Sequence, residues 1–118
     1  MKIPKNMINY REKLYATFKA TTKLEKKYDI IKMGFKTHPL WYIYDALDKD
    51  NKIYEIKVTT NEKSYNALKK NPFGRLSVLQ KENIKKLDYI IIGYCNLKGK
   101  IIECFKFDVK KNENPKPL

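Results

Sequence analysis

Residues 41–60 constrain the fold of this chain more than any other stretch of its sequence. Two runs rich in aromatic and β-branched residues flank the turn-forming cluster Asp48-Lys49-Asp50-Asn51-Lys52, a pattern that predicts a β-hairpin. With the turn centred on Asp50, residues equally distant from it pair across the two strands. Asp45 and Glu55, each five residues from Asp50, are therefore predicted to lie opposite one another.

This pairing gathers three charged side chains on one face of the hairpin. Residues two apart on a strand share a face, so Lys57 joins Asp45 and Glu55, with Cβ atoms roughly 5–8 Å apart. Carboxylates are hard oxygen ligands for a divalent cation such as Mg²⁺. A lysine beside them can orient an attacking water or offset the charge of a phosphate. The three residues together predict a metal-dependent hydrolytic site.

A plain structural interpretation competes with this chemistry. Alternating charged residues often form the solvated face of a half-buried sheet, and the strand that carries Glu55 fits that pattern. The partner strand fits it less well, because Asp45 shares a face with Trp41, Ile43 and Leu47, which we expect to be buried. An unpaired carboxylate among buried apolar residues is costly, which favours a functional role.

Asp45, a nine-residue spacer and Glu55-Ile56-Lys57 resemble the core motif of the PD-(D/E)xK nuclease superfamily. Tyr44 departs from the pattern, since the family name places proline there. The resemblance implies a restriction-endonuclease-like fold. It also implies a Mg²⁺ ion, replaceable by Mn²⁺, that is bound by both carboxylates and the Ile56 carbonyl, with Lys57 positioning or helping to deprotonate the attacking water.

Two further segments extend the resemblance. Family members begin with a helix that carries a glutamate and ends at a glycine, which implies Glu25 before Gly34 as a third acid, with Glu12 as the alternative or either glutamate merely solvated. Leu76-Ser77-Val78-Leu79-Gln80 resembles a Leu-Ser-x-x-Gln stretch whose glutamine reaches toward the phosphate or the metal-bound water. The same Ser77 and Gln80 also fit a helix capping box, and we expect Gln80 to be unable to serve both roles readily.

The remaining elements follow from capping residues, periodicity and turn formers. We expect an N-terminal arm at 1–9, a helix from Tyr10 to about Lys32 in one piece or two, a short strand at 35–38 before the hairpin, helices at 62–70 and 77–87, strands at 88–94 and 101–107, and a disordered tail at 110–118. The order predicts an α/β fold. Its mixed central sheet is flanked by helices and has the αβββαβ core of the restriction-like family plus an extra C-terminal hairpin strand. Residues 1–109 form a single domain by this interpretation.

The charge balance indicates a phosphate-rich partner, with a membrane-surface role and the lysine-rich codon bias of an AT-rich genome as the competing explanations. The chain has 26 Lys and Arg against 13 Asp and Glu, a formal net charge of +13. We therefore predict binding to duplex or branched DNA, with Arg75, Ser77 and Lys36 as contacts. Because a chain of 118 residues offers little surface for enclosing duplex DNA, we also predict a homodimer that cuts both strands or a junction. No apolar run is long enough for a membrane span and no signal peptide is evident, so cytoplasmic location (host cytoplasm if the source is viral) is expected.

The sequence thus predicts a Mg²⁺-dependent DNA endonuclease with Asp45, Glu55, Lys57 and Gln80 as its catalytic residues. The alternative is a non-catalytic, basic nucleic-acid-binding protein on a degenerate nuclease fold or another α/β fold.

Overall fold

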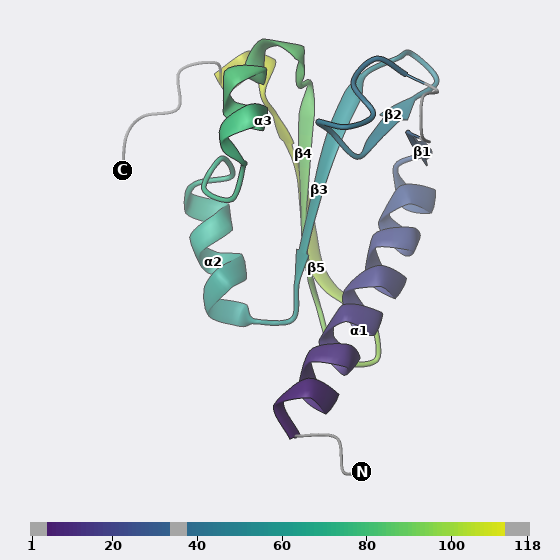
Figure 1. The fold of residues 1–118 in the computed structure, drawn as a ribbon, viewed down its shortest axis with the longest axis vertical. Coiled ribbons are helices and arrows are strands. Elements are labelled where there is room, and N and C mark those ends of the chain that lie inside the picture. The colour runs from purple at the N-terminus through teal and green to yellow at the C-terminus, as the bar shows by residue number, and fades with distance from the viewer. Residues whose placement is uncertain (1–4, 34–37, 113–118) are drawn as a thin grey trace.

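A five-stranded mixed sheet forms the middle layer of the protein. The computed structural model describes residues 5–33 and 38–112, with the sheet order β1-β2-β3-β4-β5. All neighbours are antiparallel except β3 and β4, which are parallel. The long helix α1 covers one face, and α2 and α3 cover the other (Figure 1). The elements are α1 Lys5–Lys27, β1 Ile30–Lys32, β2 Ala46–Asp48, β3 Ile53–Thr59, α2 Glu62–Lys70, α3 Val78–Glu82, η1 Ile84–Lys86, β4 Tyr89–Cys95, β5 Ile101–Asp108 and η2 Lys110–Asn112.

The central strand β4 is covered on both faces, as its nearly continuous apolar sequence predicts. Ile90 and Ile92 belong to the apolar cluster on the α2 side of the sheet, and Ile91 belongs to the cluster on the α1 side. At Gly93 a Cβ atom would lie only 2.9 Å from Cδ1 of Leu24. The missing side chain therefore lets α1 approach the sheet closely.

Helix α1 is a single continuous element of 23 residues, which settles the question of one helix or two. The hydroxyls of Thr21 and Thr22 donate to the carbonyls of Thr17 and Phe18, four residues back, so the paired threonines stay within the helix. The predicted arm at 1–9 was wrong for residues 5–9, which are helical; residues 1–4 lie outside the described part.

The predicted hairpin is confirmed, with its register. Ala46 pairs with Tyr54 and Leu47 with Ile53, each pair equally distant from Asp50. Its first strand is shorter than expected, because the chain makes helical turns before it: the Tyr44 N–H donates to the Leu40 carbonyl. β2 begins only at Ala46.

The strand that precedes the hairpin differs from the prediction. β1 is Ile30–Lys32, which we expected to be the end of the helix. Helix α1 stops earlier, at Lys27, and the chain turns through Asp29 with φ of 54°, a left-handed conformation that breaks the helix. Of the strand predicted at 35–38, residues 35–37 lie outside the described part, and His38 is in a bend.

The second half of the chain follows the prediction more closely. α2 has the expected bounds, and the Asn61 side chain caps it by accepting from the Ser64 N–H. The Ser77–Gln80 capping box opens α3, which ends at Glu82 and is continued by the short 3₁₀ turn η1. In the tail at 110–118, which we expected to be disordered, Lys110–Asn112 form a 3₁₀ turn, and 113–118 lie outside the described residues.

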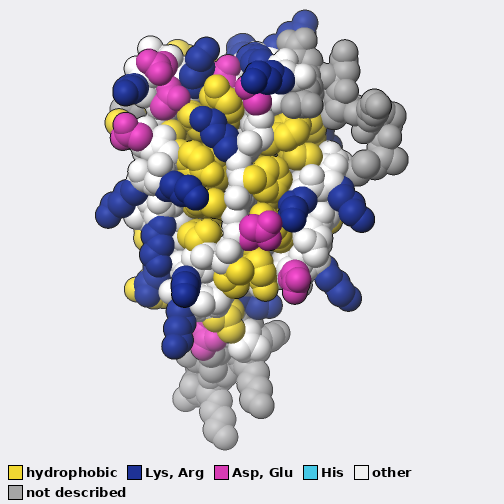
Figure 2. Space-filling model, turned by 180° about the vertical axis from the view of Figure 1, so that it is seen from behind, with side chains coloured by type: hydrophobic (Ala, Val, Ile, Leu, Met, Phe, Trp, Pro, Cys, Tyr) yellow, Lys and Arg dark blue, Asp and Glu magenta, His cyan; other side chains and the backbone are white. Residues whose placement is uncertain are grey.

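β5 is the edge strand at the back of the molecule. Figure 2 shows apolar side chains gathered along this edge with lysines around them. Ile102 is exposed, and Ile101, Phe105 and Phe107 are half-buried. No helix in the described part of the chain is long and apolar enough to cross a membrane.

Candidate active site

The candidate site lies at the edge of β3, where β2 ends. β2 pairs with β3 only at Ile53 and Tyr54. Beyond that point the side chain of Asp45 replaces the missing strand: its Oδ2 accepts from the Ile56 N–H at 3.0 Å. The N–H and C=O of one strand residue lie on the same edge, so the Ile56 carbonyl opens on the side of β3 where Asp45 lies.

Asp45 and Glu55 differ sharply in environment. Asp45 is exposed, which contradicts the expectation of a carboxylate among buried apolar side chains, because the turns before β2 remove Trp41 and Ile43 from its strand. Glu55 is the buried carboxylate, with 2% of its surface accessible. The unusual acid of this hairpin is therefore Glu55.

Two of the contacts of Glu55 go to a single carboxylate oxygen. Oε2 accepts from Lys57 Nζ at 2.8 Å and from Gln80 Nε2 at 3.0 Å. Oε1 is buried and accepts no hydrogen bond from an N–H or O–H donor among the described residues. A buried, unpaired carboxylate oxygen is costly, and a bound cation would relieve that cost.

The pKa of Glu55 is raised to about 7, mainly by burial and also by Asp45, through its charge and a hydrogen bond between the two acid groups, while Lys57 opposes these effects. The ion pair with Lys57 is therefore too weak to offset desolvation and carboxylate repulsion. Near neutral pH, Glu55 therefore lies between its protonated and its ionised form.

Gln80, on α3, also contacts Glu55 and fixes its orientation. Its Oε1 accepts from the Ser77 N–H at 3.0 Å, which completes the capping box. Its Nε2 donates both to Glu55 and to the Ile43 carbonyl, at 2.7 Å. We expected that one glutamine could not readily both cap a helix and reach the site. That expectation was wrong, because the amide oxygen of Gln80 makes the cap and its amide nitrogen contacts Glu55.

Tyr44, which stands where the family motif has proline, ties α3 to the acidic hairpin. It is buried, and its hydroxyl lies 2.7 Å from the Gln80 carbonyl and 2.9 Å from the Asn83 carbonyl, donating its proton to this pair. Burial, and secondly the charge of Glu55, raise the pKa of Tyr44 to about 12, so the hydroxyl keeps that proton. Sequence reasoning treated Tyr44 only as a departure from the motif and missed this role.

Glu25, on α1, stands near Asp45. Burial raises the pKa of Glu25, Lys32 opposes that effect, and the charge of Asp45 adds to it. The alternative, Glu12, lies 13 positions earlier on the same helix, about 20 Å away at 1.5 Å per residue. Of the two glutamates, Glu25 is therefore the one placed to join the cluster.

The oxygen atoms of the site have the chemistry of ligands for a hard divalent cation. No group of three His, Cys, Asp or Glu side chains in the described part of the chain is arranged to hold a metal. Mg²⁺ needs fewer protein ligands, since it usually keeps several waters and binds through one or two carboxylates. The Asp45 and Glu55 carboxylates, the unpaired Glu55 Oε1 and the Ile56 carbonyl provide such a set of hard oxygens.

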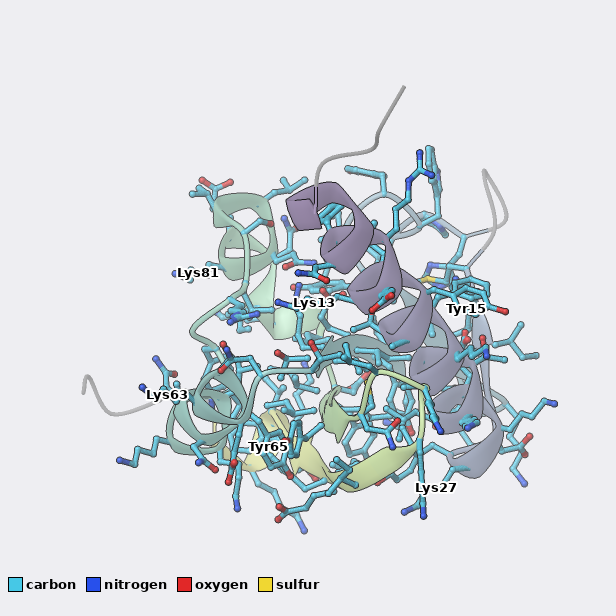
Figure 3. All side chains as sticks on the ribbon, turned by 90° about the horizontal axis from the view of Figure 1, so that it is seen from below. Lys13, Tyr15, Lys27, Lys63, Tyr65 and Lys81 are labelled. Carbon is cyan, nitrogen blue, oxygen red and sulfur yellow. The ribbon has the colours of Figure 1, made fainter. Side chains whose placement is uncertain are left out.

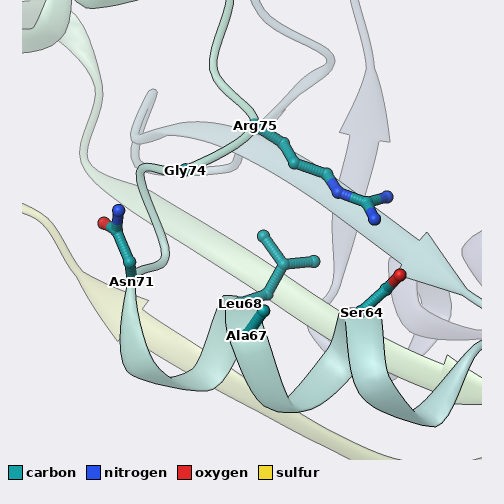
Figure 4. Close-up of a pocket in the computed structure, with 6 residues that line it drawn as sticks. All are labelled: Ser64, Ala67, Leu68, Asn71, Gly74 and Arg75. Carbon is teal, nitrogen blue, oxygen red and sulfur yellow. The ribbon is translucent and has the colours of Figure 1, made fainter. Parts of the chain in front are cut away.

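Of the predicted nucleic-acid contacts, the structure describes Ser77 and Arg75. Ser77 is exposed, and its hydroxyl accepts from the Gln80 N–H. Arg75 is exposed and lines a shallow hollow beside α2 together with Ser64 and Asn71 (Figure 4). Lys36 lies outside the described residues. No protein-family model matches this chain, and no curated protein or solved structure gives a significant match to it.

The raised pKa of Glu55 predicts a pH-dependent stability in the absence of divalent cations. The folded state holds this proton more tightly than the unfolded chain, so the stabilisation is complete below pH 4.5 and is lost as the pH rises through about 7. Glu55→Gln should flatten the profile and raise the free energy of unfolding at pH 8 by on the order of 1–3 kcal/mol.

Urea denaturation in EDTA from pH 4.5 to pH 8.5 measures this difference. The exposed Glu82→Gln removes the same charge and serves as the control. Parallel profiles for the wild type and Glu55→Gln would show that Glu55 carries no such proton.

Proposed function

We propose that this protein is a Mg²⁺-dependent DNA endonuclease of the PD-(D/E)xK type, built on a restriction-endonuclease-like αβββαβ core and acting in the cytoplasm, or in the host cytoplasm if the source is viral. The observation that carries the proposal is the convergence of Asp45, buried Glu55 and Lys57 at the open edge of β3, with one Glu55 oxygen left unpaired.

The order of elements supports the proposal. A long helix, three strands in antiparallel succession, a helical crossover and a strand parallel to β3 follow one another along the chain. The two acids lie on the hairpin of this unit, and Gln80 reaches them from the crossover. Motif, register and topology agree, which is stronger support than any of them alone.

Asp45, Glu55 and the Ile56 carbonyl would hold the cation, with Glu25 as a further acid and Mn²⁺ as a substitute for Mg²⁺. When bound, the cation supplies Lewis-acid stabilisation of the negative charge that develops on the phosphate. Gln80 fixes Glu55 by its Oε2, which leaves Oε1 available. Loss of the Glu55 proton, at a pKa of about 7, turns this carboxyl into a ligand at the pH of the cell.

Lys57 connects the buried acid to the surface. Its Nζ lies 2.8 Å from Glu55 while 27% of its side chain stays exposed. An ammonium at this boundary can orient an attacking water and offset charge on the scissile phosphate. Arg75, Ser77 and Lys36 are proposed contacts to the DNA backbone, and the net charge of +13 predicts affinity that falls steeply with salt.

Cleavage assays test the proposal directly. Supercoiled plasmid, linear duplex and a four-way junction are incubated with Mg²⁺, Mn²⁺ or EDTA. We expect metal-dependent cutting that falls about 100-fold or more in Asp45→Asn and in Lys57→Ala, because each variant removes a group that acts on the reacting atoms.

Matched controls come from the tip of the same hairpin. Asp50→Asn and Lys49→Ala remove the same charges at exposed positions and should cut at the rate of the wild type. Cutting by Asp45→Asn or Lys57→Ala at that rate would rule out the assigned roles.

A non-catalytic nucleic-acid-binding protein is the second candidate. It is favoured by the Lys57–Glu55 ion pair, which partly neutralises the acid, and by the absence of a three-ligand metal group among residues 5–33 and 38–112. Salt-sensitive DNA binding with no cutting of any substrate would support it.

Cation binding can be measured without catalysis. Binding to the folded state alone should stabilise it by about 1.4 kcal/mol at ten times the dissociation constant, a rise of a few degrees in Tm. We expect Mg²⁺ or Ca²⁺ to raise the Tm of the wild type at pH 8 but not that of Glu55→Gln, while Glu82→Gln behaves like the wild type. Equal shifts in all three proteins would place the cation elsewhere.

We further propose that the protein acts as a homodimer, since one site cuts one strand at a time. The edge strand β5, with its exposed Ile102 and half-buried Phe105 and Phe107, offers a surface for a second copy (Figure 2). Sedimentation equilibrium at micromolar concentration should give twice the chain mass of 14.1 kDa. A single species of monomer mass up to about 100 μM would contradict the dimer.

A further inference from the structure

A groove runs from the end of β3 along the N-terminal half of α1. It has a volume of about 330 Å³, at the low end of the range for small-ligand sites. Its walls come from α1 on one side and from the end of β3 and the loop before α3 on the other. The lining residues are Tyr10, Lys13, Leu14, Thr17, Val58, Thr59, Thr60 and Arg75.

The groove and the candidate active site are built on the same two elements, β3 and α1. On β3, Thr59 lies on the same face as Glu55 and Lys57, about 13 Å from Glu55 along the strand. On α1, positions 10, 14, 17, 21 and 25 follow one another at steps of three and four, so the helix face that lines the groove leads back to Glu25. This spacing is short enough for one nucleic-acid chain to reach both the acids and the groove.

Its chemistry is that of a site for a phosphate chain with exposed bases. Lys13 and Arg75 are cationic, and none of the described residues that line the groove is acidic. Figure 3 shows Lys13 pointing from α1 toward the α2–α3 side. The wall also offers Tyr10, 63% exposed, and Leu14, 51% exposed. Aromatic side chains beside cations are typical of sites that stack bases and track a backbone.

We infer that this groove binds an unpaired strand of the nucleic-acid substrate, next to the phosphate that is cut. The inference rests on the proposed function, which makes the acids the point of attack. Lys13 and Arg75 hold phosphates, and the ring of Tyr10 stacks on a base. A duplex keeps its bases stacked on one another, so only an unpaired segment uses this wall. The preferred substrate is therefore DNA with a single-stranded segment, such as a tail or a branch.

The chain offers a matched control for this site on the same helix. Tyr15 is 61% exposed, close to the value for Tyr10, and points away from the groove (Figure 3). Lys19 covers its ring at 4.4 Å. The double variant Tyr10→Ala with Lys13→Ala therefore compares with Tyr15→Ala with Lys19→Ala: each loses one tyrosine and one positive charge from α1.

Fluorescence anisotropy in EDTA measures the binding of a labelled single-stranded oligonucleotide, a blunt duplex and a tailed duplex. We expect the groove variant to bind the single strand about tenfold or more weakly and to show a salt slope lower by roughly 0.7. The blunt duplex should lose less than twofold, and the control variant should match the wild type. Arg75→Ala, which leaves α1 intact, should weaken single-strand binding in the same selective way.

The outcomes separate this inference from the proposed function. Equal losses in the groove and control variants, or equal losses for the blunt duplex and the single strand, would overturn the groove assignment. A wild type that cuts DNA while all groove variants bind normally overturns only the groove. If the wild type cuts no DNA and the groove variants selectively lose single-strand binding, the nuclease is overturned and the groove assignment is supported.

Discussion

The burial of Glu55 beside Asp45 is the constraint on which the surrounding structure depends. Removing a carboxylate from water is costly, and a second carboxylate nearby adds repulsion. Lys57 and Gln80 offset part of that cost, and both do so at Oε2, so Oε1 keeps an unmet requirement for a proton or a cation. A sheet selected only for stability would place an apolar residue at this position. The costly burial of the Glu55 carboxylate is the strongest physical sign of function among the described residues.

Polar contacts around this acid also position α3. None of the five residues of the helix is buried, so apolar packing does little to hold it. The Tyr44 hydroxyl meets carbonyls at its C-terminal end, and the Gln80 amide meets Ile43 and Glu55. A short helix held by hydrogen bonds responds to changes at the bonded groups more than one held by a core. The hydrogen bond from Gln80 Nε2 to Glu55 Oε2 links the position of α3 to this acid.

Local signals explain what could be predicted from the sequence. The turn residues around Asp50 set the hairpin register and so bring Asp45 close to Glu55. The spacing of Ser77 and Gln80 predicted the capping box at the start of α3. The misses involve contacts between distant segments or backbone conformations without a glycine. The Tyr44 hydroxyl meets groups 36 and 39 residues away, and α1 ends through Asp29 in a left-handed conformation that is rare for a residue with a side chain. Neither leaves a periodic pattern in the sequence.

Local burial outweighs the net charge of the chain at this site. A formal charge of +13 should favour ionised carboxylates, yet the pKa of Glu55 is raised. Exposed charges farther than about 8–10 Å are largely screened by salt, whereas desolvation acts on the group itself. The same positive field would oppose the approach of any free divalent cation and favour a polyanion. Under the proposed function, a phosphate bound first would reverse the local field and favour the cation. By linkage, the cation then strengthens DNA binding by the same factor.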